Sequence, residues 1–181
     1  MGAGRTEMVE SIFGLRKLER GEIYLHGKKV RIKNTRDAIK NKIALIPEDR
    51  KQIGLNLIAS VKDNITIVSI DQFTKCGFVS RKKERQVVDE QVKLLNIKTP
   101  SRNQLVNNLS GGNQQKVVIS KWLVSNADII ILDEPTGGID VGAKSEIHYL
   151  ISKLAQSGKA VIVISSEMPE VIGMSDRVLV M

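Results

Sequence analysis

Short apolar runs between polar stretches dominate the hydrophobic pattern of this chain. Three segments are almost wholly apolar and bounded by polar or turn-forming residues: 42–46, 129–132 and 160–164. Runs of this length and composition are typical of strands buried in a parallel sheet. The middle run ends in Asp133 and Glu134, so it predicts a strand that delivers two carboxylates to the carboxyl edge of the sheet, where α/β proteins bind ligands. Residues 177–181 predict the start of one further strand.

Most of the remaining chain shows one of two other hydrophobic patterns, the alternation typical of strands or the spacing typical of amphipathic helices. Residues 22–26 and 28–32 alternate around Gly27, which predicts a β-hairpin. Residues 60–105 have an amphipathic helical pattern with Ser60 as its first cap and Pro100 near its end. Further helices are predicted over three segments: 35–41 with Thr35 as cap, 142–157 closed by Gly158, and 168–176. Trp122 is interpreted as a core residue, and His148 as an ordinary helix side chain.

Candidate chemistry lies between the helical span and the second apolar run. Residues 109–115 combine a hydroxyl, two glycines and amide side chains, which predicts a loop that opens a helix. Free backbone N–H groups and the positive end of the helix dipole can meet a phosphate there. An anion-binding helix start together with an acidic pair at the end of a strand is what a nucleotide–magnesium site needs.

Composition narrows the class of protein. The chain has 181 residues, enough for one sizeable core, and a single cysteine, Cys76, excludes an intramolecular disulfide. No apolar run approaches the roughly 18 residues needed to cross a bilayer. The net charge is +8, and thirteen of the 28 Lys/Arg lie within residues 1–51. Because these cations are scattered and aromatic residues make up only 3% of the chain, the charge favours a solvated face and nucleotide steering over a nucleic-acid partner.

The motifs resemble those of the ATP-binding-cassette (ABC) ATPases. The run Leu109, Ser110, Gly111, Gly112, Asn113, Gln114 is similar to the LSGGQ signature, with Asn113 intervening before Gln114. The strand ending in Asp133 and Glu134 is similar to the Walker B segment, and Asp140 matches the aspartate of the D-loop. The resemblance implies that Asp133 holds Mg²⁺ through water and that Glu134 polarises the attacking water. It also implies that Ser110 and the N–H groups of the two glycines contact ATP held by a partner domain, with a Cβ at either glycine blocking that approach.

The N-terminus resembles a degenerate P-loop. Gly2, Ala3, Gly4, Arg5, Thr6 and Glu7 form the nucleotide-binding set that the resemblance implies. Arg5 stands where the motif has lysine, and Thr6 stands at the magnesium hydroxyl, while the first glycine of the motif would fall before Met1. The alternative is a plain glycine-rich helix start with Thr6 as a capping hydroxyl.

Two later positions also depart from the ABC pattern. Glu48 occupies the place of a glutamine that touches the magnesium or the attacking water, and it is assigned a catalytic contact. Ser166 occupies the place of the switch histidine and cannot act as a protonatable group. With Arg5, these departures indicate that the chain's own nucleotide site is impaired.

The whole chain is therefore identified as an α/β, P-loop NTPase domain of the ABC ATPase type. The expected domain has a small antiparallel β layer, a helical subdomain over about residues 60–125, and truncation at both ends. The Gly-Arg-Thr-Glu and Pro-Glu-Asp-Arg-Lys runs are similar to those in the second ATPase domain of bacterial two-domain importers for simple sugars.

That resemblance implies an ATP-hydrolysing, energy-coupling subunit that uses ATP and Mg²⁺ on the cytoplasmic face of the plasma membrane. Its implied partners are a second ATPase domain, membrane permeases and, indirectly, a periplasmic sugar-binding protein. Two alternatives stay open: a non-hydrolysing nucleotide-binding or dimerisation module that completes a partner's ATP site, and a soluble ABC protein of DNA repair or translation.

Overall fold

A three-stranded parallel sheet organises the computed structural model, which describes residues 4–181. Its strands are β3 (Ile43–Ile46), β6 (Ile129–Asp133) and β7 (Ala160–Ile164), in the order β3-β6-β7. Leu45 is paired with Ile131, and Ile131 with Ile162. Because β6 has a strand on each side, four of its five residues are buried, and Asp133 is brought to the carboxyl edge between the ends of β3 and β7.

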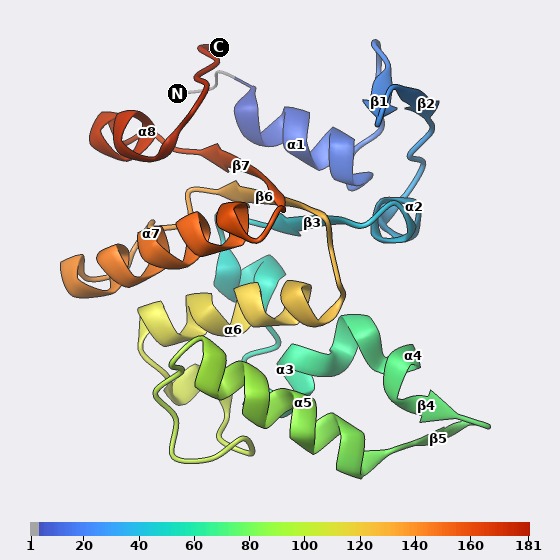
Figure 1. The fold of residues 1–181 in the computed structure, drawn as a ribbon, viewed down its shortest axis with the longest axis vertical. Helices are drawn as coiled ribbons and strands as arrows, with labels where there is room; N and C mark the ends of the chain where they lie inside the picture. Colours follow the sequence, from blue (N-terminus) through green and yellow to red (C-terminus); the bar gives the residue numbers. More distant parts are fainter. Residues whose placement is uncertain (1–3) are drawn as a thin grey trace.

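Helices cover this sheet and supply most of the core. In Figure 1, α1 (Arg5–Phe13) lies above the sheet, and α6 (Gly111–Val124) lies below it. Phe13 of α1 meets Trp122 of α6 edge-on, with ring centroids 5.4 Å apart, so Trp122 is a core residue as predicted. The other helices beside the sheet are α2 (Thr35–Lys40), α7 (Val141–Gln156) and α8 (Met168–Met174). None of the helices in the described part of the chain is long and apolar enough to span a membrane.

The predicted hairpin is present. It consists of β1 (Ile23–Leu25) paired antiparallel with β2 (Lys28–Val30). The two turn residues, His26 and Gly27, have φ angles of 50° and 74°. This left-handed pair is the turn whose twist matches the flanking strands, and Gly27 adopts it without steric cost.

The segment between β3 and α6 is more broken than the predicted amphipathic helix. A π-helix, η1 (Arg50–Gly54), follows β3, and short helices α3 (Val61–Thr66), η2 (Ile67–Ser69) and α4 (Ile70–Phe73) come next. A two-stranded hairpin, β4 (Thr74–Lys75) and β5 (Phe78–Val79), then interrupts the helical pattern. The main helix here is α5 (Arg81–Leu94), and the 3-10 helix η3 (Val106–Asn108) leads into α6. The boundary at about residues 60–125 stays a prediction, although α3, α5 and α6 do pack together.

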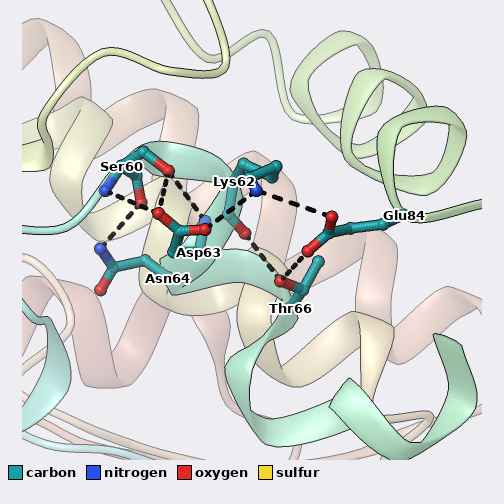
Figure 2. Close-up of polar contacts among 6 residues, drawn as sticks. All are labelled: Ser60, Lys62, Asp63, Asn64, Thr66 and Glu84. Carbon is teal, nitrogen blue, oxygen red and sulfur yellow. Dashed lines mark hydrogen bonds and ion pairs between the residues drawn. The ribbon is translucent and has the colours of Figure 1, made fainter. Parts of the chain in front are cut away.

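A polar network fixes the start of this helical part (Figure 2). Asp63 N–H donates to Ser60 Oγ at 3.1 Å, and the Asp63 carboxylate accepts from the Ser60 backbone in return, which makes a capping box. Glu84 of α5 is buried and accepts from Thr66 Oγ1 at 3.2 Å, with Lys62 Nζ 3.6 Å away. The cap at Ser60 was predicted, whereas the inward side chain of Glu84 was not.

Several local expectations were wrong. Asn34, not Thr35, caps α2, because the Asn34 side chain accepts from Asp37 N–H. Residues 177–181 form no strand, because within the described chain they pair with no other strand. Val178, Leu179 and Val180 are therefore exposed. Strand β7 is not fully buried, because it is an edge strand and Ile162 is 42% exposed.

Candidate nucleotide site

Side chains from three elements meet at the carboxyl edge of the sheet. Thr6, in the first turn of α1, donates from Oγ1 to Oδ2 of Asp133 at 2.8 Å. Arg5, one residue earlier, donates from Nη1 to the carbonyl oxygen of Ser165, just after β7, at 3.0 Å. The first turn of α1 is therefore docked across the ends of β6 and β7. Thr6 does not cap its own helix in this arrangement, because α1 begins after Gly4 in a left-handed conformation without a side-chain cap.

Asp133 has the properties of a cation ligand. Its side chain is buried, and Oδ1 has no hydrogen-bond partner among residues 4–181. Burial raises the pKa of Asp133, and the charges of Glu48 and Glu134 raise it further, against the hydrogen bond from Thr6 and the charge of Arg5. A buried carboxylate oxygen without a partner is costly unless something neutralises it. A hydrated cation beside Asp133 and Thr6 would supply that neutralisation.

No cluster of three His, Cys, Asp or Glu side chains able to hold a metal occurs within the described residues. Magnesium fits the observed pair nevertheless, because it keeps several waters and is held in nucleotide sites by one or two protein oxygens together with substrate phosphates. The donor set of one carboxylate and one hydroxyl is compatible with that mode of binding.

Replacing Asp133 with asparagine is expected to stabilise the nucleotide-free chain at neutral pH. The folded-state pKa of Asp133 is raised, so its contribution to stability is fully present below the ordinary Asp pKa and is lost as the pH rises. Asparagine removes this loss and keeps an acceptor for Thr6. The Tm should rise at pH 7–8, by about 2–4 °C for each kcal/mol gained. The gain should shrink as the pH falls toward about 4 in a thermal-denaturation series. A lower Tm for the variant at pH 8 would contradict this account.

The turn after β6 presents Glu134 outside the buried core. Glu134 has a φ of 45°, and its N–H donates to the carbonyl oxygen of Ile164 at 2.9 Å. Gly137 N–H donates back to the Glu134 carbonyl at 3.0 Å, which closes the turn. A left-handed conformation is uncommon for a non-glycine residue and costs free energy. Asp140 then accepts from Ala143 N–H at 2.9 Å and caps α7.

Residues 109–114, called the signature loop below, lie at the start of α6 and apart from the Thr6–Asp133 contact. Ser110 precedes the helix, but within residues 4–181 its side chain makes no capping hydrogen bond; instead Oγ accepts from Asn113 Nδ2 at 2.8 Å. The other end of the Asn113 amide accepts from Lys98 N–H at 2.8 Å, which fixes its orientation. The exposed Ser110 hydroxyl therefore keeps its proton to donate outward, beside the first free N–H groups of a 14-residue helix. Gln114, in contrast, is buried and donates to the carbonyls of Val106 and Leu109.

The two signature glycines are packed against the chain itself. A Cβ on Gly112 would lie 2.6 Å from the Ala143 Cβ of α7. A Cβ on Gly111 would lie 2.8 Å from Nη2 of Arg50 and 3.3 Å from the carbonyl oxygen of Gly138. The sequence interpretation gave these glycines only a role toward a phosphate, whereas the structure shows an internal steric reason for both.

A cleft of about 560 Å³ opens at this edge. Its walls include Thr6, Glu48, Arg50, Asp133 and Gly138. The predicted residues near the cleft therefore come from the first turn of α1, the turn after β3 and the end of β6.

The remaining predicted residues are placed as follows. Gly2 and Ala3 lie outside the described residues. Glu7 is exposed in the first turn of α1, and Ser166 is exposed after β7. The signature loop is not part of the cleft formed by Thr6 and Asp133.

Two polar arrangements escaped the sequence interpretation. Glu170 of α8 is buried and contacts both Thr136 Oγ1, at 3.1 Å, and His148 Nε2, at 2.7 Å. His148 therefore has a defined partner, contrary to its interpretation as an ordinary helix side chain. Arg50 reaches across the cleft to the segment after Glu134, and burial lowers its pKa, with Asp49 opposing the change. Neither contact has a local sequence signal, because the partners are 22 to 88 residues apart.

Together these features define a class. A parallel sheet with a left-handed glycine before α1, a hydroxyl–carboxylate pair at its carboxyl edge and an adjacent glutamate is the framework of a P-loop nucleotide-binding domain.

Comparison with known proteins gives the family within that class. The family model described as "ABC transporter" matches residues 1–137, and the chain belongs to this family. The chain is 56% identical over 181 residues to a putative ribose/galactose/methyl galactoside import ATP-binding protein of Geobacillus kaustophilus, covering 100% of the chain and 36% of that protein. A xylose import ATP-binding protein of Thermoanaerobacter pseudethanolicus is 54% identical, over 99% of the chain and 36% of that relative. The chain thus spans about a third of the length of these curated relatives.

Solved structures give the same fold. A dimeric ATP-binding cassette in a post-hydrolysis state, bound to ADP and Pi, matches with a TM-score of 0.74 and 25% identity, covering 92% of this chain and 72% of that one. A dimeric bacterial ABC transporter cassette matches with a TM-score of 0.76 and 26% identity, covering 94% and 73%. The predicted α/β ABC ATPase fold, with its small antiparallel sheets and helices, is confirmed.

Proposed function

We propose that this chain is an ATP-binding and ATP-hydrolysing domain that couples energy to the import of simple sugars. The observation that carries the proposal is the contact between Thr6 and the buried Asp133 beside Glu134, at the ligand-binding edge of the sheet. Relatives of this chain are described as import ATP-binding proteins for ribose, galactose and xylose. These descriptions support simple sugars as the class of transported substrate.

In the proposed mechanism the residues position reactants and place charge. Asp133 and Thr6 would hold Mg²⁺, which when bound neutralises charge on the phosphates. Glu134 would orient and polarise the attacking water, and Glu48 would accept a hydrogen bond from it. Phosphoryl transfer depends mainly on such positioning and charge placement.

The two sites of the proposed assembly would differ in strength. The chain's own site has Arg5 in place of lysine, and the Arg5 guanidinium already donates to the Ser165 carbonyl. A planar guanidinium anchored in this way is a poorer match for the β/γ-phosphates than a free ammonium point charge. The signature loop, with its exposed Ser110 hydroxyl, would instead complete a stronger site whose P-loop belongs to a partner ATPase domain.

We infer the location and partners of the working assembly from the same relatives. The domain would sit peripherally on the cytoplasmic face of the membrane, against permease subunits that receive sugar from a periplasmic binding protein. The anchored Arg5 also supports a second candidate, a non-hydrolysing module that binds nucleotide and only completes the partner's site.

Binding of Mg-ATP to the chain tests the proposed site. Thr6→Val and Asp133→Asn are each expected to weaken binding at least about tenfold, equivalent to ~1.4 kcal/mol, because each removes an oxygen function from the cation site. Titration calorimetry in Mg²⁺ and again in EDTA should show the loss only with the metal. Ser11→Ala, on the same helix and away from the sheet edge, is the control. Equal affinity of both variants and the wild type in Mg²⁺ would overturn the site.

Turnover separates the two candidate functions. Both candidates expect ATP hydrolysis when the chain is mixed with a competent partner domain, because in both the signature loop completes the partner's site. Only the energy-coupling proposal expects hydrolysis at the chain's own site as well, so Glu134→Gln in this chain should lower the turnover of the mixture. Unchanged turnover for Glu134→Gln, with nucleotide binding retained, would favour the non-hydrolysing module.

A further inference from the structure

Arg50 connects three segments that are far apart in the sequence. Its Nη1 donates to the carbonyl oxygen of Gly137 at 2.8 Å, and its Nη2 donates to that of Gly138 at 3.1 Å. These carbonyls belong to the segment between Glu134 and Asp140. Arg50 itself opens η1, two residues after Glu48.

The start of the signature helix lies against the same guanidinium. A methyl group on Gly111 would approach Nη2 of Arg50 to 2.8 Å and the Gly138 carbonyl oxygen to 3.3 Å. Two neighbouring carbonyls with a fixed spacing suit the planar fork of arginine, whereas a lysine ammonium is a single point donor. The contact therefore depends on arginine and on a glycine at position 111.

Turn η1 is also anchored away from Arg50. Asp49 accepts from the N–H groups of Lys51 and Gln52 at 3.0 and 2.9 Å. At the other end, Lys121 of α6 is buried and donates from Nζ to the Gly54 carbonyl oxygen at 2.6 Å. Helix α6 thus packs against Arg50 at its start and is hydrogen-bonded to η1 near its other end. π-Helical turns are rare, and they frequently occur at functional sites.

We propose that Arg50 is a positioning residue that makes the Glu48 turn, the Gly137–Asp140 segment and the signature loop move as one unit. This inference rests on the proposed function, in which Glu48 and Glu134 serve the chain's own nucleotide and Ser110 serves the partner's. Arg50 then couples the two sites, because a shift of the segments at the chain's own site is passed to the signature loop, and the reverse, through one guanidinium.

Hydrogen exchange of the chain tests the physical link directly. Arg50→Lys keeps the positive charge and the aliphatic part of the side chain but loses the two-pronged guanidinium. The variant should therefore fold, but it should no longer hold the Gly137–Asp140 segment and the signature loop together. Exchange should become about five- to tenfold faster at the protected amides of Gln114, Gly137 and Ala143, and stay unchanged within β6. Gln52→Ala, an exposed position on the same turn, is the matched control and should change none of them. Faster exchange confined to residues 50–54 would overturn the coupling.

Kinetics of the chain mixed with a competent partner domain test its consequence. Arg50→Lys is expected to lower kcat per active molecule about tenfold with KM within twofold. Because a loss of active protein also lowers the apparent kcat at constant KM, the rate is divided by the fraction of the chain that binds Mg-ATP in titration. A merely structural defect would lower the Tm and that fraction, and the corrected kcat would equal the wild-type value. An unchanged kcat with an active wild type would overturn the inference alone. An inactive wild-type mixture would count against the proposed function, and the exchange pattern would still decide the role of Arg50.

Discussion

Replacing Ser110 with arginine is expected to abolish the ATPase activity of a complex formed by this chain and a competent partner domain. The exposed Ser110 hydroxyl and the free N–H groups at the start of α6 are the donors proposed for the partner's γ-phosphate. Removing one such donor typically lowers kcat by about 10²–10³-fold, and the arginine side chain would also fill the space meant for phosphate. Arg5→Ala should have a smaller effect, below about tenfold in the same steady-state assay, because Arg5 lies in the site that we propose to be the weaker of the two.

The pair of variants decides between a symmetric and an asymmetric mechanism. Ser110→Arg should leave Mg-nucleotide binding to the chain's own site unchanged, since Ser110 is outside the cleft that Thr6 and Asp133 line. Ser110→Ala, which removes only the hydroxyl, should fall between wild type and Ser110→Arg. Equal losses of activity for Ser110→Arg and Arg5→Ala would contradict the asymmetric assignment.

The central sheet could be predicted from sequence because its signal is local. Each of β3, β6 and β7 is an apolar run, apart from Asp133 at the end of β6, and the sequence predicts each strand to within one residue of its observed bounds. The cap at Ser60 follows from a short motif whose physics is confined to one helical turn, and residues 109–115 do open a helix as predicted, although Ser110 does not cap it. The structure brings together Thr6 and Asp133, the two residues assigned to the metal, although their binding of a metal stays a prediction.

Two buried glutamates and the β4–β5 hairpin could not be predicted from the sequence, because they depend on tertiary partners or on a weak turn signal. Glu84 and Glu170 look like solvated helix residues in the sequence, and only packing of α5 against α3 and of α8 against α7 buries them. The β4–β5 hairpin turns at Cys76 and Gly77, with φ angles of 51° and 81°. A single glycine was the only cue to this turn within a long helical pattern.

Gly112→Ala is expected to lower the free energy of unfolding by about 1–3 kcal/mol, the usual cost of overpacking. The new methyl would lie 2.6 Å from the Ala143 Cβ, so α6 and α7 must separate to accept it. Glycine to alanine within a helix otherwise stabilises by up to about 1 kcal/mol, so the sign of the change is informative. Gly173→Ala in α8, where a Cβ would meet nothing within 4 Å, is the matched control and should not destabilise the chain in urea unfolding.

A double-mutant cycle then separates packing from function at Gly112. Ala143→Gly removes the opposing methyl and should cost up to about 1 kcal/mol alone, but combined with Gly112→Ala the total should fall short of the sum by roughly 1 kcal/mol. Strict additivity would contradict the steric explanation. If the double variant regains both stability and ATPase activity with a partner domain, Gly112 is needed only for the packing of α6 on α7. If stability returns while activity does not, the methyl must obstruct the partner's phosphate, and the glycine serves both the fold and the site.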